Sequence, residues 1–327
     1  MNRFTSLPAE IVNEIAFLAD KSTLLALCRV CKATNSPATR TLYRYLLLES
    51  PRQVVQCLKA LLKNDYAAKS CRAFGIECQI DVTQALHLNN FFRLIAKALV
   101  RIRMVEAISL TISHWFPGAI RLVQAIDFIL KDCTFPHLEH AHLQMAVTPT
   151  VASFLERHQK TLKSVVLCPR GVGPSSLEES SVQYHFPRLA NVRATASVAL
   201  PFFKAISGTL PALTSLDINW DPFDMVDHKQ LIDAVRKKDA PLDMVTFLRT
   251  GWNKELIEEM SLCFPHIRDL SICSYLAIGL NTTVPPDLID DIAKNLKRFK
   301  SPGLFLVDHQ ALGNATSANS PRASHRT

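Results

Sequence analysis

The sequence has few glycines and no long uninterrupted apolar run. Only 9 of its 327 residues are glycine, against 18 prolines, a balance that favours frequent stops between rigid elements over flexible linkers. A membrane-spanning helix needs about 20 consecutive apolar residues, so we expect no membrane partner. The first residues show no basic stretch followed by an apolar run and a cleavage site, and we therefore expect no secretory leader.

The cysteines do not follow the pattern of a disulfide-stabilised secreted protein. Their number is odd, 9, and their spacing is irregular, so we expect reduced thiols in an intracellular protein of the cytoplasm, the nucleus or both. Cys28 and Cys31 have the spacing of half a zinc site, but no second pair accompanies them. His140 and His142 share a strand face without a third ligand. We predict no metal site and no cofactor.

The motifs of common enzyme classes are also missing. The glycines of Gly171-Val172-Gly173-Pro174 are not followed by the Lys-Ser/Thr pair of a phosphate-binding loop. Neither Gly-x-Ser-x-Gly nor His-Glu-x-x-His occurs. The net charge is +8, but the basic residues are scattered, so we do not expect nucleic acid as a partner. These absences favour a binding protein over an enzyme.

What is present at the N-terminus is a series of short amphipathic segments. Residues 7–11, Leu-Pro-Ala-Glu-Ile, open a helix, because proline suits the first helical position and an acidic residue suits the first turn. Ile15 lies on the same face as Ile11. Ser22 is a candidate cap of a second helix, whose apolar stripe is Leu24, Leu27, Cys28 and Cys31.

A third helix and a first strand are predicted to follow. Ser36-Pro37 has the cap-then-proline pattern of a helix start. The apolar and aromatic run over residues 42–48 is typical of a strand. Three helices in about 40 residues enclose only a thin core, so we expect them to rest on a partner or on the next domain.

The order and spacing of these segments resemble the F-box module of fungal F-box proteins. The similarity is carried by residues 7–11, by the second helix with its Val30-Cys31-Lys32 end, and by Ala38 to Leu48. The resemblance implies binding to a Skp-family adaptor and, through it, to the cullin of a ubiquitin ligase. It also implies which residues form or support that surface, namely Leu7, Pro8, Ile11, Ile15, Leu24, Leu27, Val30 and Cys31.

From residue 70 onward, one short pattern recurs: apolar, two variable, apolar, one variable, apolar. Its middle apolar residues are spaced by 24 to 34 positions, in or slightly above the leucine-rich-repeat range of about 20–29. These middle residues are Phe74, Ile108, Ala141, Val165, Val192, Leu216, Val245 and Leu270. The pattern predicts one strand per repeat. A Phe-Pro or Leu-Pro pair precedes four of the strands, at positions 135, 186, 210 and 264, and indicates a fixed turn there.

Helix-like stretches lie between the predicted strands, at residues 120–130, 151–162 and 253–264. We therefore predict an α/β protein in which a three-helix F-box (residues 1–48) precedes a leucine-rich-repeat-like solenoid with a parallel inner sheet (49–305). This layout resembles the irregular leucine-rich repeats that follow fungal F-boxes. The polar composition of residues 306–327 predicts a disordered tail.

The variable positions of each strand are predicted to line the concave face and to bind a target protein of unknown identity. The candidates are His140, His142, Arg193, Asp217, Asn219 and, as an anchor at the rim, Trp220. The resulting hypothesis is a substrate-recognition adaptor of a Skp–cullin–F-box ubiquitin ligase. The alternative is a ligase-independent scaffold or interaction protein, in which the N-terminal helices only cap the solenoid.

Overall fold

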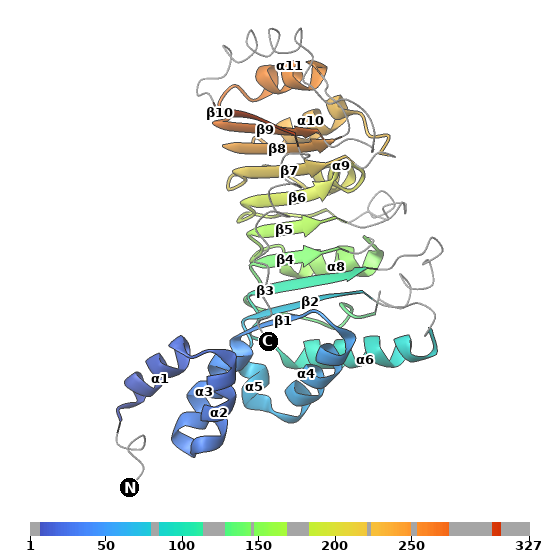
Figure 1. The fold of residues 1–327 in the computed structure, drawn as a ribbon. Helices are drawn as coiled ribbons and strands as arrows, with labels where there is room; N and C mark the ends of the chain where they lie inside the picture. The colour runs from blue at the N-terminus through green and yellow to red at the C-terminus, as the bar shows by residue number, and fades with distance from the viewer. Residues whose placement is uncertain are drawn as a thin grey trace, which may run out of the picture. The chain divides into compact units, whose positions relative to one another are not determined.

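Strands and helices alternate along the chain in two compact units, Met1–Phe186 and Pro187–Thr327 (Figure 1). The computed structural model describes residues 7–79, 85–113, 128–144, 147–168, 183–220, 224–249, 254–274 and 303–308. Three helices open the first unit: α1 (Ala9–Leu18), α2 (Lys21–Val30) and α3 (Lys32–Arg44). They enclose a small core of Ala16, Leu24, Leu27 and Ala38.

The ends of two of these helices differ from the sequence prediction. Asp20, and not Ser22, caps α2, since its carboxylate accepts a hydrogen bond from the Thr23 N–H at 2.7 Å. Helix α3 begins before Pro37, which lies inside it. The buried Thr34 hydroxyl donates to the Leu27 carbonyl at 2.8 Å, and this bond ties the early start of α3 to the end of α2.

The strands of each unit form a parallel ladder in chain order, which confirms the predicted parallel sheet. Those of the first unit are β1 (Tyr45–Leu48), β2 (Ala73–Gln79), β3 (Ala107–Ser113), β4 (His140–Leu143) and β5 (Ser164–Leu167). Those of the second unit are β6 (Asn191–Thr195), β7 (Ser215–Asn219), β8 (Met244–Arg249), β9 (Asp269–Ser274) and β10 (Gly303–Asp308).

The middle apolar residues of the repeat lie directly opposite one another. In the first unit Phe74 pairs with Ile108, Ile108 with Ala141, and Ala141 with Val165. In the second unit the same succession joins Val192, Leu216, Val245 and Leu270. All of these side chains are at most 3% exposed. The phase of the sequence repeat therefore gives the strand register.

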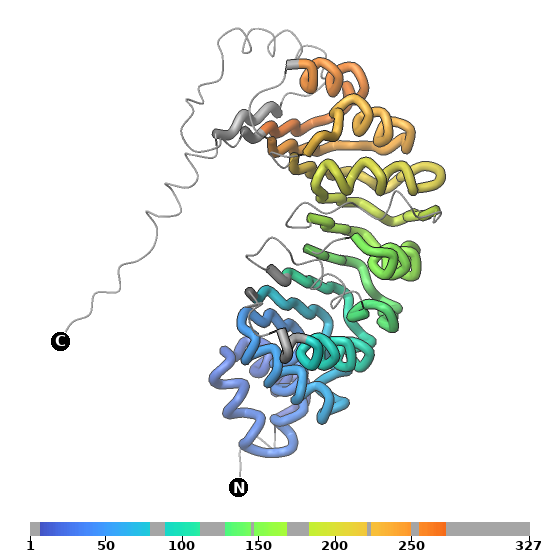
Figure 2. Tube along the Cα trace, turned by 90° about the vertical axis from the view of Figure 1, so that its right-hand side faces the viewer, coloured from blue at the N-terminus to red at the C-terminus, as the bar shows by residue number. Residues whose placement is uncertain are grey.

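Helices lie on one side of the strands in each unit (Figure 2). The first unit contains α4 (Pro51–Lys63), α5 (Asp65–Ser70), α6 (Ala85–Arg101) and α8 (Pro149–His158), and the second contains α9 (Ala196–Ala205), α10 (His228–Arg236) and α11 (Lys254–Cys263). The predictions over 151–162 and 253–264 correspond to α8 and α11. Residues 120–127 of the remaining prediction lie outside the described residues. Within the described ranges, no helix has both the length and the apolar character needed to span a bilayer.

The predicted turns before the strands are present. The N–H of Leu138 donates to the carbonyl of Phe135 at 3.1 Å, and Leu213 and Ile267 make the equivalent bonds to Leu210 and Phe264, each at 3.2 Å. Each turn places proline at its second position, where the fixed φ of that residue is preferred. The remaining pair, Phe186-Pro187, falls at the boundary of the two units.

The last strand corrects the predicted start of the disordered tail. β10 pairs with β9 from Gly303 to Asp308, so residues 306–308 form part of a strand. The free edge of a parallel ladder has unpaired N–H and C=O groups. The short apolar run after Gly303 pairs with these groups on β9. The other residues assigned to the tail, 309–327, lie outside the described part of the chain.

A buried histidine joins α8 to the turn before β4. The His158 side chain accepts a hydrogen bond from the Phe135 N–H through Nε2 at 2.9 Å, and its Nδ1–H donates to the Phe154 carbonyl at 2.7 Å. Its ring lies against both phenylalanine rings, with centroid distances of 5.8 and 4.4 Å. Burial lowers the pKa of His158, because the charged imidazolium would lose its hydration. Protonation of Nε2 would also remove the acceptor of the Phe135 N–H.

We predict that this histidine makes the first unit less stable in acid. The unfolded chain takes up the proton near the ordinary pKa of about 6.5, whereas the folded chain takes it up only at lower pH. The contribution to stability is therefore complete above that value and decreases as the pH falls below it, by at most about 1.4 kcal/mol per pH unit for one proton. Urea unfolding between pH 7.5 and 5 measures it. His158→Gln should lower the stability at all pH values and flatten this dependence, and an unchanged slope would contradict the assignment.

Candidate interaction surfaces

Exposed large apolar side chains are concentrated at the start of the chain. Half of those found exposed among the described residues precede residue 31, with 37% to 80% of their area open to solvent. They are Leu7, Ile11, Ile15, Phe17, Leu18, Leu25 and Val30. We call this set the N-terminal apolar surface. An exposed cluster of this kind is typical of a protein-binding surface.

The residues predicted to bind the adaptor divide between this surface and the core below it. Leu7, Pro8, Ile11, Ile15 and Val30 are exposed. Leu24 and Leu27 are buried, and Cys31 is half-buried with its Sγ 3.4 Å from the Thr34 hydroxyl.

Phe17, Leu18 and Leu25 extend the surface beyond the predicted set. Leu18 continues the helix face of Ile11 and Ile15, which was a usable signal in the sequence. The sequence could not show that this face is exposed, because exposure depends on what packs against the helix.

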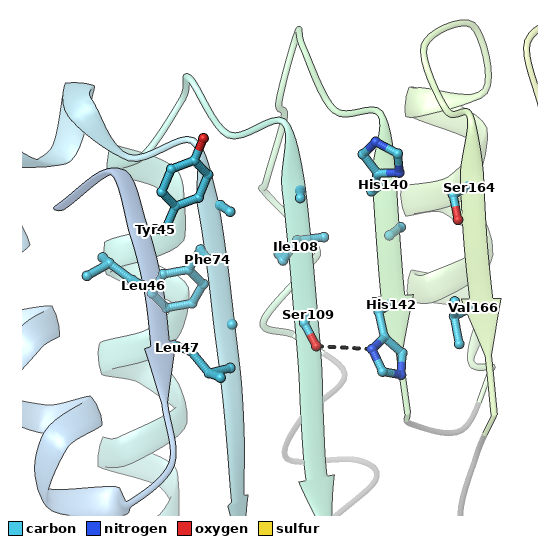
Figure 3. A pocket seen from close by; sticks show the side chains of 14 residues that line it. Tyr45, Leu46, Leu47, Phe74, Ile108, Ser109, His140, His142, Ser164 and Val166 are labelled. Atoms are coloured by element: carbon cyan, nitrogen blue, oxygen red, sulfur yellow. Dashed lines mark hydrogen bonds between the residues drawn. The ribbon is translucent and has the colours of Figure 1, made fainter. Parts of the chain in front are cut away.

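A second candidate site is a groove of about 310 Å³ on the open face of β1 to β5 (Figure 3). Its outward side chains form two rows across the strands, since alternate residues of a strand face the same side. The first row is Tyr45, Ala73, Ala107, His140 and Ser164, and the second is Leu47, Gly75, Ser109, His142 and Val166. The predicted residues His140 and His142 are therefore neighbours on one strand of this groove.

The wall formed by the histidines is held in place. His142 Nδ1 lies 3.2 Å from the Ser109 hydroxyl, and its Nε2 lies 3.1 Å from the Gln144 side-chain amide. His140 lies two residues before His142 on the same face of β4 and is exposed. The other wall carries Tyr45 and Leu47, which are 65% and 55% exposed.

The open face of the second unit has a different character. The Arg193 guanidinium pairs with the Asp217 carboxylate at 3.2 Å, between neighbouring residues of β6 and β7. Burial raises the pKa of Asp217, and the charge of Arg193 opposes that rise. Asn219, two residues further along β7, is half-buried. These three predicted residues thus share one polar face.

Trp220 does not form the predicted anchor at the rim. Its side chain is 6% exposed, packs edge-on against Phe247 with centroids 5.4 Å apart, and donates from Nε1 to the Val226 carbonyl at 3.2 Å. The position after a strand suggested exposure. The Phe247 ring provides the packing contact and the Val226 carbonyl the hydrogen-bond acceptor, so the indole belongs to the core.

The thiols and ionisable groups do not assemble a reactive centre in the described ranges. No group of three or more His, Cys, Asp or Glu side chains there is arranged to hold a metal ion. Burial raises the pKa of both Cys71 and Cys133 to about 12, so these thiols stay protonated and unreactive. Cys28 lies with its Sγ 3.6 Å from the Thr39 hydroxyl. Gly171 to Pro174 lie outside the described residues.

Comparisons with known proteins do not assign a family. No protein-family model matches the chain, and no curated protein has a matching sequence. Among solved structures, a chain of the crystal structure of the Rad7 and Elc1 complex in yeast is similar to it at 13% identity. That alignment covers 95% of each chain with a TM-score of 0.40.

The division between exposed and buried apolar residues predicts opposite effects on stability. We expect the double substitution Leu7→Asp with Ile11→Asp to change the local stability of α1 to α3 by no more than about 0.5 kcal/mol, because both side chains already face water. Leu27→Ala should lower it by about 2–4 kcal/mol, because it leaves a cavity in a small core. Hydrogen exchange of the amides in residues 9–44 measures both. Strong deprotection in the double variant would show that these side chains are structural.

Proposed function

We propose that this chain is a substrate-recognition adaptor of a Skp–cullin–F-box ubiquitin ligase. In this proposal the N-terminal apolar surface binds a Skp-family adaptor, and through it the cullin, while the open strand faces bind the target protein. The observation that carries it is the concentration of exposed large apolar side chains on α1 and α2. The F-box resemblance of the same segment supports the kind of partner.

The energetics of the three helices favour an intermolecular partner. Their buried core contains two alanines among its central residues, Ala16 and Ala38, so little of their apolar surface is used internally. Fully burying one leucine, isoleucine or phenylalanine side chain stabilises a complex by about 1.5–3 kcal/mol. Several such side chains on one surface therefore offer a partner substantial binding energy, provided that the helices are already ordered.

The proposed mechanism involves no chemistry on this chain. An adaptor acts by holding its target close to the ubiquitin-transferring subunits, which raises the effective concentration of the target there. On this proposal the protein is not an enzyme.

The alternative scaffold role is supported by how closely α3 is joined to the repeats. The Ser36 hydroxyl is 2.7 Å from the Tyr66 hydroxyl of α5. The N–H of Arg72 donates to the Arg44 carbonyl at the end of α3 at 2.9 Å. Because α3 also serves as a cap, deletion of residues 1–48 would disturb the repeats under either hypothesis. Substitutions on exposed residues separate the two.

We predict that wild-type protein co-purifies with a Skp-family adaptor and that Leu7→Asp with Ile11→Asp binds at least about tenfold more weakly. Only 38% and 46% of these side chains remain exposed, so each lost contact is worth less than half of the about 1.5–3 kcal/mol of full burial, and about 1.4 kcal/mol corresponds to a tenfold change in affinity. Titration calorimetry with the purified adaptor measures the change. Val100→Asp with Leu262→Asp is the matched control, because it alters two exposed apolar residues on other helices, α6 and α11.

The control should retain wild-type affinity. Absence of adaptor binding by the wild type, or equal affinity in the Leu7/Ile11 variant, would rule out the adaptor role and leave the scaffold role.

A further inference from the structure

We propose that the groove on the open face of β1 to β5 takes one uncharged aromatic side chain from a target polypeptide. This inference specifies the target-binding part of the proposed function and rests on it. Four features of the groove carry it: a floor of small side chains, a lining without Asp, Glu, Lys or Arg, aromatic or imidazole rings on both walls, and a histidine wall held by hydrogen bonds.

The floor is low because the residues facing outward on β2 and β3 are small. Ala73 and Gly75 lie beside Ala107 and Ser109 in the two rows. Neighbouring strands are about 4.8 Å apart, so the walls on β1 and β4 are separated by roughly 14 Å at the backbone. The volume of about 310 Å³ is at the lower limit of pockets that hold small molecules, about 300–1,000 Å³. It suits a single large side chain.

The lining favours an uncharged occupant. None of the residues that line the groove is Asp, Glu, Lys or Arg. At the strand starts beside it, Arg72 pairs with Glu106 at 3.4 Å and Lys163 pairs with Glu139 at 2.7 Å, so these charges neutralise one another. Among the lining residues themselves, a charged side chain would lose water without meeting an opposite charge.

The walls favour an aromatic ring over an aliphatic chain. Figure 3 shows the Tyr45 ring on one side of the groove and the His140 and His142 rings on the other. Aromatic pairs with centroids 4.5–7 Å apart gain about 0.5–1.5 kcal/mol beyond the area that they bury. The Ser164 hydroxyl is a hydrogen-bond partner for an indole N–H or a phenol. An aliphatic side chain would gain from burial alone.

The histidine wall is held in place before anything binds. Both ring nitrogens of His142 are engaged, by Ser109 and Gln144. On the other side Leu47 leans over Gly75, so closely that a Cβ at position 75 would lie 2.9 Å from Leu47 Cδ1. A site that is already ordered loses less conformational entropy on binding, so more of the contact energy appears as affinity.

The test is a selection of displayed random nonapeptides on the intact protein, followed by affinity measurements on synthetic copies. We expect the selected peptides to share one Trp, Tyr or Phe. Ala107→Leu raises the floor and should weaken their binding at least tenfold. Tyr45→Ala removes one wall and should also weaken it. Ala33→Leu is the matched control, because it makes the same substitution at an exposed position of α3 outside the groove, and it should bind within twofold of wild type.

Circular dichroism and the melting temperature establish that each variant is folded. The proposal is overturned if no peptide is selected, if the peptides lack a shared aromatic residue, or if folded Ala107→Leu binds them as tightly as wild type. A titration of the protein with indole alone tests whether the groove binds a small apolar molecule. Binding of indole in the absence of any selected peptide would assign the groove to a small apolar ligand and would also overturn the proposal.

The failure of this proposal can be told apart from failure of the ligase role. Ala107→Leu should lose the peptides and keep the Skp-family adaptor, whereas Leu7→Asp with Ile11→Asp should do the reverse. Peptide binding by a wild-type protein that does not bind the adaptor would reject the ligase role alone.

Discussion

The lateral contact between one buried apolar side chain and its counterpart on the next strand determines most of this structure. Phe74, Ile108, Ala141 and Val165 follow one another across the first unit at matching positions. Side chains alternate along a strand, so a shift of one residue would turn every core residue toward water. Burial of these residues therefore also decides which residues face outward, and the groove between Tyr45 and His140 exists because this register is kept.

Each unit has a parallel strand ladder, but the open faces of the two ladders differ in chemistry. In the first, small residues such as Ala73 and Gly75 leave an uncharged hollow between rings. In the second, Arg193 and Asp217 form an ion pair across neighbouring strands. Helix α1 buries the small residue Ala16 and leaves the larger apolar residues Ile11 and Ile15 exposed.

Much of the fold was predictable because its signals are local and repeated. The strand pattern located β2 to β9, and the proline before β4 marked a turn whose hydrogen bond is present. Signals that depend on context were less informative. Pro37 suggests a helix start, yet it lies inside α3. The strand at Gly303–Asp308 was missed because the residues after it are so polar that the whole segment resembled a tail.

The periodicity of apolar residues was set by the sequence alone, and with it the strands, the register and the three N-terminal helices. Exposure was decided only by the tertiary structure. Leu24 and Ile11 both lie on apolar helix faces, but only Leu24 is covered, and Trp220 is buried although it directly follows a strand. The groove likewise joins residues from Tyr45 to Val166. Periodicity is a property of neighbours along the chain, whereas burial and concavity depend on segments that meet only after folding.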